Sequence, residues 1–283
     1  MDFLEAAFLG IIQGLTEFLP ISSSAHLRIT ALFLPGADDP GATFTAITQI
    51  GTELAVIVYF WGDITRIIGR WFSQWSRRRP RGSELALDYD ADVRMGWLVI
   101  LGSIPIAVAG FLLQDIIRSE FRSLWIVAIV LVVFGVILGL CDRLGKRVHE
   151  LRQLGYRDGL LIGVAQALAL VPGVSRSGAT TSMGLALGYT RPAAAKYGFL
   201  LAIPAVFGSG LYELVHAIRE PGAGGYGFPE TLVATVLAFV VGLAVVRFLM
   251  RWIQTHSFMP FVVYRIALGG ILLIALSFGW IQP

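Results

Sequence analysis

Two apolar stretches of this sequence are each broken by proline and followed by serines, and no unbroken arm of either can cross a bilayer. The first stretch covers residues 3–34 and breaks at Pro20; the second covers 159–187 and breaks at Pro172-Gly173. Helical arms of this kind reach about 20–26 Å at 1.5 Å per residue, whereas a hydrocarbon core is about 30 Å thick. Broken backbone at that depth must be buried in protein or line a wet cavity. We therefore predict two re-entrant helix hairpins.

The two broken stretches are also similar in sequence. Without gaps, residues 10–27 align with residues 163–180, a shift of 153 positions. Identical residues stand at positions 10, 13, 15, 22 and 24, opposite Gly163, Gln166, Leu168, Ser175 and Ser177. Each copy is an apolar helix, a break, a group of serines and a second helix. We predict an internal repeat with halves of approximately residues 1–145 and 146–283.

Composition indicates that the rest of the chain is also in the membrane. Hydrophobic residues make up 56% of the sequence and charged residues only 14%, which is typical of an integral membrane protein. Six further apolar segments are candidate spans: 42–61, 93–113, 124–140, 193–218, 231–250 and 261–280. The predicted fold is an all-α polytopic membrane protein, with six transmembrane helices plus two re-entrant helix hairpins in one domain, 1–283.

The distribution of arginine predicts the orientation of the chain. Segments 62–92 and 142–158, which we predict as hydrophilic loops, are strongly basic, whereas 35–41 and 219–230 are not. The positive-inside rule places both basic loops in the cytoplasm and both termini outside. Three spans per half is an odd number, so the second repeat is inverted, an architecture that points to a site near the membrane midplane. The net charge of +3 lies mostly in loops, and it indicates topology rather than a nucleic-acid partner.

The second break carries the groups of an oxyanion receptor. Gly173 permits a positive φ, and Ser175 and Ser177 are good N-cap residues for the helix that follows. Helix-start amides bind anions, and Arg176 adds a planar fork of donors suited to phosphate. Thr180, one turn further on, either adds a hydroxyl or simply packs. The alternative is a capped turn with a snorkelling arginine, but an arginine between two segments too short to span favours binding.

The first break carries different chemistry. Gln13 and Glu17 are spaced i, i+4 on one helix face, and a carboxylate inside a membrane protein is a functional candidate. Ser22 and Ser23 precede His26 by about one turn, so we expect hydroxyl and imidazole to meet on the second arm. Such groups serve nucleophilic or general-base hydrolysis. The structural alternatives are an ion pair for Glu17 and a simple hydrogen bond for His26.

Together the hairpins predict a phosphoryl-transfer site at the membrane. The second hairpin supplies an anion cradle, and the first supplies an acid, a base and a nucleophile. A phosphate-bearing lipid would keep its tail in the bilayer while its head enters the site. The alternative is a transporter or flippase of an anionic or lipid-phosphate substrate, because inverted re-entrant repeats are transporter architecture. The different chemistry of the two hairpins favours the enzyme.

Two motifs resemble the signatures of the bacitracin-resistance family of undecaprenyl-diphosphate phosphatases. Residues 13–26 read Q-G-L-T-E-F-L-P-I-S-S-S-A-H and residues 172–180 read P-G-V-S-R-S-G-A-T; the resemblance extends into 44–61 and 197–212. It implies hydrolysis of undecaprenyl (C55 polyprenyl) diphosphate to the monophosphate and inorganic phosphate, recycling the lipid carrier for cell-wall synthesis. It also implies a bacterial plasma-membrane protein whose active site faces the extracytoplasmic side, and a divalent cation, Mg²⁺ or Ca²⁺, as cofactor.

Site residues follow from the resemblance by position. Catalytic positions match Glu17, His26 and Arg176, and the family's proposed nucleophile matches Ser23. Pyrophosphate contacts match Ser175 and Thr180. We further expect Gln13, Ser22, Gly173 and Ser177 to contact the substrate, and Glu17 to hold the cation. The sequence leaves open whether Ser23 or a water molecule attacks. The first acidic position of the motif is Gln13, which the family pattern permits but which removes one charge for a metal.

Overall fold

The computed structural model describes residues 3–34, 41–75, 83–113, 123–219 and 226–282. Within these ranges the regular elements are helical, and six helices are long and apolar enough to cross a membrane. These are α3 (Gly41–Tyr59), α5 (Ser83–Leu112), α7 (Leu124–Leu144), α10 (Arg191–Arg219), α11 (Phe228–Thr255) and α12 (Met259–Ser277). They confirm the predicted all-α polytopic class. Residues 35–40 of the predicted turn and residues 220–225 of the 219–230 loop lie outside the described residues.

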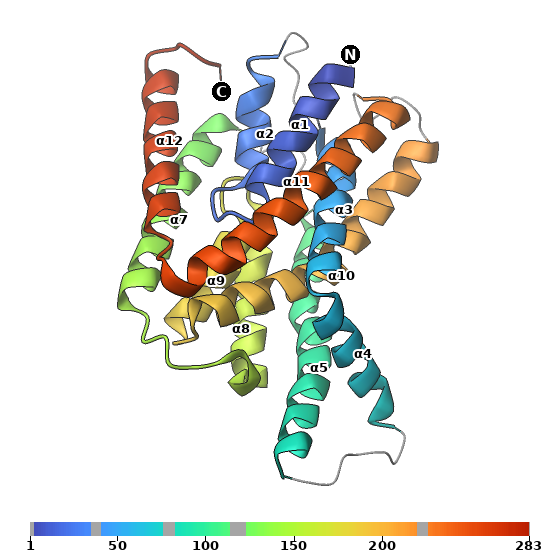
Figure 1. Ribbon diagram of the computed structural model, residues 1–283. Helices are drawn as coiled ribbons and strands as arrows, with labels where there is room; N and C mark the ends of the chain where they lie inside the picture. Colours follow the sequence, from blue (N-terminus) through green and yellow to red (C-terminus); the bar gives the residue numbers. More distant parts are fainter. Residues whose placement is uncertain (1–2, 35–40, 76–82, 114–122, 220–225, 283) are drawn as a thin grey trace.

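Each predicted break separates two short helices (Figure 1). Helices α1 (Phe3–Thr16) and α2 (Ser23–Ala31) flank the first. Helix α8 (Tyr156–Ala167), the 3₁₀ turn η3 (Leu168–Leu170) and helix α9 (Arg176–Ala186) flank the second. The lengths of these helices agree with the predicted re-entrant arms, which stay a prediction because the structure contains no membrane.

The second helices of the two hairpins begin in the same way. Ser22 caps α2 and Ser175 caps α9, their Oγ atoms accepting from the backbone N–H of Ala25 at 3.5 Å and of Gly178 at 3.2 Å. Both serines have a positive φ, 74° and 68°, which is uncommon for a residue with a side chain. The two serines, 153 positions apart, thus have the same capping role and the same backbone conformation, and this supports the predicted repeat.

The first helix of each hairpin packs closely against a long helix from the other half of the chain. Helix α1 meets α11 at Gly10, where a Cβ would lie 2.4 Å from the carbonyl oxygen of Ala234. Helix α8 meets α5 at Gly163, where a Cβ would lie 2.3 Å from the carbonyl oxygen of Gly102. Glycine is therefore required at both crossings, and this exchange between the halves also supports the inverted repeat.

The prediction of a hydrophilic loop over residues 62–92 is wrong for the part that the structure describes. Helix α4 (Trp61–Ser73) follows α3, and α5 begins at Ser83, ahead of the predicted start at 93. Arg66 and Arg70 of α4 both donate to Oδ2 of Asp92 on α5, each at 2.8 Å. These ion pairs join α4 to α5, and the segment is an amphipathic helix whose charged residues lie on one face. The basic run 77–81 lies outside the described residues.

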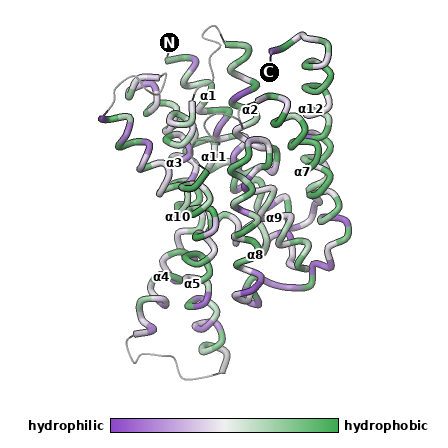
Figure 2. The backbone as a smooth tube through the Cα atoms, turned by 180° about the vertical axis from the view of Figure 1, so that it is seen from behind, coloured by the Kyte–Doolittle hydropathy of each residue, from purple (hydrophilic) through white to green (hydrophobic). Residues whose placement is uncertain are grey.

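Both chain termini lie at one end of the molecule, and the α4–α5 arm projects from the other (Figure 1). The connection from α7 to α8, which includes the turn η2 (Leu151–Gln153), lies toward the same end as this arm. Figure 2 shows hydrophilic residues gathered on that connection, whereas the spanning helices are mostly hydrophobic. The termini and the described parts of the basic segments therefore lie at opposite ends, as the predicted topology requires.

Candidate active site

The breaks of the two hairpins contact each other inside the molecule. The hydroxyl of Ser177 donates to the carbonyl oxygen of Leu19 at 3.2 Å. The fully buried guanidinium of Arg265, on α12, donates to the carbonyl oxygens of Pro20 at 3.0 Å and of Gly173 at 2.7 Å. One side chain therefore holds both turns together. The sequence analysis missed it, although an arginine inside an apolar span is a recognisable signal.

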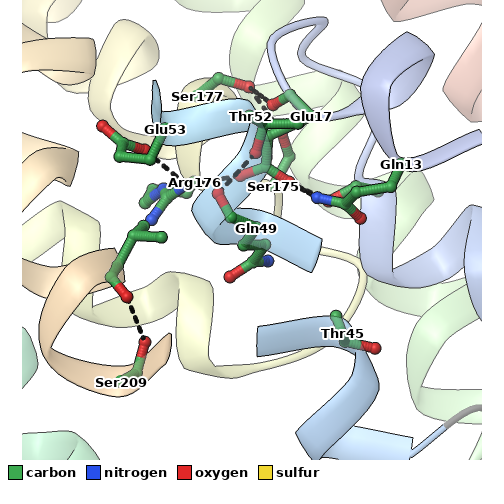
Figure 3. A network of polar contacts seen from close by, with 12 residues as sticks. Gln13, Glu17, Thr45, Gln49, Thr52, Glu53, Ser175, Arg176, Ser177 and Ser209 are labelled. Carbon is green, nitrogen blue, oxygen red and sulfur yellow. Dashed lines mark hydrogen bonds and ion pairs between the residues drawn. The ribbon is translucent and has the colours of Figure 1, made fainter. Parts of the chain in front are cut away.

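Glu17 is the centre of the polar network between the hairpins (Figure 3). Its Oε2 accepts hydrogen bonds from Nε2 of Gln13 at 2.7 Å and from Oγ of Ser23 at 2.6 Å. Its Oε1 accepts from Nη2 of Arg176, which belongs to the other hairpin. The carboxylate is nearly inaccessible, with a side-chain exposure of 5%. The structure thus brings three other predicted site residues to the carboxylate of Glu17.

The other predicted hydroxyls lie along the two turns. Oγ of Ser22 is 3.1 Å from that of Ser24, and Oγ of Ser175 is 3.1 Å from that of Ser177. Ser177 also lines the small cavity beside Arg176. Of these four serines, Ser177 also contacts Glu17, and its hydroxyl donates to the main-chain oxygen of Glu17 at 3.4 Å.

Two predicted contacts of the second hairpin have structural partners. Thr180 is fully buried, and its Oγ1 donates to the carbonyl oxygen of Arg176 at 2.9 Å. Gly173 has φ +97°, and a Cβ there would lie 2.8 Å from the carbonyl oxygen of Val127. In this structure both residues shape the turn that presents Arg176.

His26 makes its hydrogen bonds away from the serine hydroxyls. Its Nδ1 is 2.7 Å from the carbonyl oxygen of Ser22, and its Nε2 is 2.8 Å from the hydroxyl of Tyr264. The two rings stack, with centroids 5.6 Å apart. The expected contact between imidazole and a serine hydroxyl is not made, because Nδ1 bonds the main chain one turn back. Tyr264 comes from α12, and no motif pointed to it.

A second carboxylate, which the sequence analysis also missed, approaches Arg176 from α3. Oε2 of Glu53 lies 3.8 Å from Nη2 of Arg176, and Glu53 is only 1% exposed. Glu17, Glu53, Arg176 and Ser177 line a cavity of about 10 Å³, which is room for about one water molecule. An acidic residue in the middle of a predicted span was the available signal.

This arrangement is suited to phosphoryl transfer. The guanidinium of Arg176 is a bidentate donor for phosphate oxygens. The Ser23 hydroxyl has a carboxylate base at 2.6 Å, within the range for an activated nucleophile. The described residues contain no group of three or more metal-ligating side chains, but two carboxylates suit Mg²⁺, which is commonly held by one or two carboxylates plus substrate phosphates. The fold defines a multi-pass membrane protein, and its buried cluster of carboxylate, guanidinium and hydroxyl groups has the composition of a hydrolase active site.

Comparison with known proteins identifies the family. A family model described as bacitracin resistance protein BacA matches residues 6–271, and the chain belongs to this family. It is 62% identical over 283 residues, the full length of both chains, to a protein of Micrococcus luteus named undecaprenyl-diphosphatase. It is 61% identical over 279 residues, 99% of this chain and 98% of the relative, to the undecaprenyl-diphosphatase of Clavibacter michiganensis. An undecaprenyl-diphosphatase 2 of Agrobacterium fabrum is 55% identical over 282 residues, 100% of this chain and 98% of the relative. The predicted family is confirmed.

Proposed function

We propose that this protein hydrolyses undecaprenyl diphosphate to undecaprenyl phosphate and inorganic phosphate. The names of its full-length relatives support this reaction. The single observation that carries it is the contact between Arg176 and Glu17. Through this contact an anion-binding group of one hairpin lies beside the carboxylate that holds the Ser23 hydroxyl on the other.

The substrate diphosphate takes the place of Glu17 as the partner of Arg176. A guanidinium binds phosphate oxygens bidentately, and it stabilises the charge that develops on them in the transition state. The start of α9, with Ser175 and Ser177, supplies further donors beside it. The cavity between Glu17, Glu53 and Arg176 holds about 10 Å³, so the hairpins must separate slightly to admit the head group.

Ser23 is the nucleophile in this proposal. Its hydroxyl already donates to Oε2 of Glu17, so this carboxylate can take the proton as Oγ attacks the terminal phosphorus. The bond from that phosphorus to the bridging oxygen breaks, and prenyl monophosphate leaves. Water then hydrolyses the phosphoserine, releases inorganic phosphate and restores the hydroxyl. Gln13 orients Glu17 through the hydrogen bond to the same oxygen.

His26 and Tyr264 form a hydrogen-bonded pair whose protonation can be assigned from the contacts. A carbonyl oxygen only accepts hydrogen bonds, so the 2.7 Å contact with Ser22 requires a proton on Nδ1. In the neutral ring Nε2 is then an acceptor for the Tyr264 hydroxyl. In this proposal the proton that Glu17 takes from Ser23 returns to the serine oxygen in the second step, and the contact of His26 with Tyr264 holds α2, which carries Ser23, against α12.

The divalent cation and the side of the membrane are also part of the proposal. Glu17 is the ligand that the resemblance implies for the cation, which neutralises phosphate charge when it is bound. Both termini, and the end of the molecule at which they lie, face the extracytoplasmic side, where the site is reached by the lipid head group. The basic segments at the opposite end support this orientation.

The test is an assay of the purified protein in detergent with undecaprenyl diphosphate. We expect stoichiometric release of inorganic phosphate and of the prenyl monophosphate, measured by colorimetry and by chromatography of the lipid. A flippase needs two membrane leaflets, so turnover in detergent separates the two functions. Intact diphosphate after prolonged incubation with Mg²⁺ or Ca²⁺ present would contradict the phosphatase.

A further inference from the structure

Glu53 is a buried carboxylate without an adequate partner. It is 1% exposed, and its Oε1 has no hydrogen-bond partner among the described residues. Its other oxygen is 3.8 Å from Arg176, too long for a hydrogen bond. A carboxylate in a protein interior stays ionised only when close partners compensate its charge, and the 3.8 Å ion pair with Arg176 is the one such contact that Glu53 makes among the described residues. Such a group is expected to have a ligand that the free protein does not provide.

The charges around the cavity point to the nature of that ligand. When both are ionised, Glu17 and Glu53 contribute two negative charges and Arg176 one positive charge, and all three line the same cavity. The sum of these three is −1, which is unfavourable for a diphosphate. A divalent cation between the carboxylates brings the sum to +1 and makes the site attractive to an anion.

The sequence gives an independent reason to look for a second carboxylate. The motif that contains Glu17 begins at Gln13, an uncharged residue at the position where the family pattern also permits an acid. The amide of Gln13 bonds Glu17 and adds no negative charge. Glu53 approaches the same Arg176 nitrogen that Glu17 contacts, but from α3 instead of α1. The two carboxylates thus lie on either side of one small cavity (Figure 3).

We propose that Glu53 is a cation ligand of this chain and that it completes, together with Glu17, a two-carboxylate divalent-cation site. Glu53 supplies from α3 the charge that Gln13 does not supply from α1. Glu17 and Glu53 would hold the cation in the free protein, and Arg176 would then be available to the phosphate oxygens of the diphosphate. The inference rests on the proposed function, because the diphosphate would add oxygen ligands to a cation that the two carboxylates already hold.

The test measures cation binding directly, without turnover. Mn²⁺ is titrated into the purified full-length protein in detergent, and free Mn²⁺ is followed by electron paramagnetic resonance. We expect Glu53→Gln to weaken Mn²⁺ binding by about 10-fold or more, and Gln13→Glu in the Glu53→Gln background to recover most of that loss. Glu213→Gln is the matched control. Glu213 is a buried glutamate on α10 whose Oε2 accepts from Thr43, and it does not line the cavity.

An affinity of Glu53→Gln within twofold of the unchanged protein would overturn the proposal, and so would a double variant that binds no better than Glu53→Gln. If Glu53→Gln does not elute as a folded species, Glu53→Asp is measured instead. Aspartate keeps the negative charge, but its side chain is shorter by one methylene group, so weaker Mn²⁺ binding is again expected. Unchanged Mn²⁺ binding would contradict the proposal. Phosphate release by the unchanged protein is assayed in parallel, so failure of the proposed function is seen separately from failure of this site.

Discussion

Arg176 is the residue on which the two hairpins depend chemically, because it is the only predicted donor that crosses from one hairpin to the carboxylate of the other. We expect Arg176→Lys to lose most activity while the protein still folds. Lysine keeps the charge but loses the planar fork that fits two phosphate oxygens. Loss of such a donor lowers kcat by about 10²-fold or more. Steady-state kinetics of the variant is the measurement, and near-normal turnover would mean that Arg176 is structural.

Ser23 decides between covalent and direct hydrolysis. If its hydroxyl attacks, Ser23→Ala should abolish turnover while substrate still binds, since Arg176 is unchanged. If water attacks, the variant loses a hydrogen bond worth about 0.5–1.5 kcal/mol, which slows the reaction by roughly tenfold or less. A single-turnover rate measurement separates these cases. Retention of a tenth or more of normal kcat would leave a water activated by Glu17.

At the residue scale the sequence predicted the side chains that lie within the two motifs. The i, i+4 spacing put Gln13 and Glu17 on one face, and the structure joins them. It could not place Glu53, Tyr264 or Arg265, because their roles depend on how α3 and α12 pack on the hairpins. A polar residue inside an apolar segment is recognisable as unusual from the sequence. The sequence does not show which residue of another helix it contacts.

At the scale of elements, Arg265 of α12 joins the two hairpin turns. Its guanidinium donates to four carbonyl oxygens, those of Pro20, Leu131, Gly173 and Val174. Arg265→Met removes all of these donors and leaves buried acceptors, each costing about 1–3 kcal/mol when unsatisfied. We expect a marked fall in the thermal midpoint in detergent, followed by fluorescence or light scattering. An unchanged midpoint would mean that the turns are held in another way.

Helix α4 is attached through an ion-pair cluster around Asp63. Its carboxylate accepts from Nζ of Lys196 on α10 and from Nη2 of Arg66, each at 2.6 Å. Burial opposes ionisation of Asp63, but the hydrogen bonds from Lys196 and Arg66 outweigh it and bring the pKa of this carboxyl below its usual value. Its stabilising effect is thus present above the unfolded pKa of about 3.9 and is lost as pH falls through the lower folded value.

We therefore expect Asp63→Asn to destabilise the protein at pH 7 by about 1 kcal/mol or less, since the cluster is partly exposed. The difference between variant and unchanged protein should shrink as the pH falls below about 4 and disappear only below the lower pKa of the folded state. Thermal unfolding at several pH values measures this. A difference that persists in acid would contradict the assignment of the effect to the Asp63 charge.

Helix α4 itself was not predicted, and the reason is physical. The charged residues of this segment lower its mean hydropathy, which indicates only that the segment is outside the membrane. A hydrophilic segment outside the membrane was therefore predicted to be a loop. A local signal was nevertheless present, because apolar residues recur at helical spacing at positions 64, 67, 68 and 71. What the sequence could not show is where this helix packs: ion pairs link Arg66 and Arg70 to Asp92, and Asp63 to Lys196. Pairing over such separations is decided by the fold, not by local sequence.

At the scale of the whole molecule, the number of spans and the positions of the two breaks were predictable from apolar length and proline alone. The orientation in the membrane gives a separate test. With Cys141 replaced, Gln282→Cys should react with a membrane-impermeant thiol reagent in intact cells, and Arg157→Cys should not. Both positions are exposed, and they lie at opposite ends in the predicted topology. Labelling at Arg157→Cys from outside would overturn the proposed orientation.

The central claim is that the two halves of the molecule share one active site through Arg176 and Glu17. The most direct test compares kcat/KM of Glu17→Gln, Arg176→Lys and the double variant. Residues that act as a unit show strongly non-additive losses, so we expect the double variant to be no more than about threefold worse than the poorer single variant. If the two losses simply multiply, Glu17 and Arg176 act independently, and the shared site is contradicted.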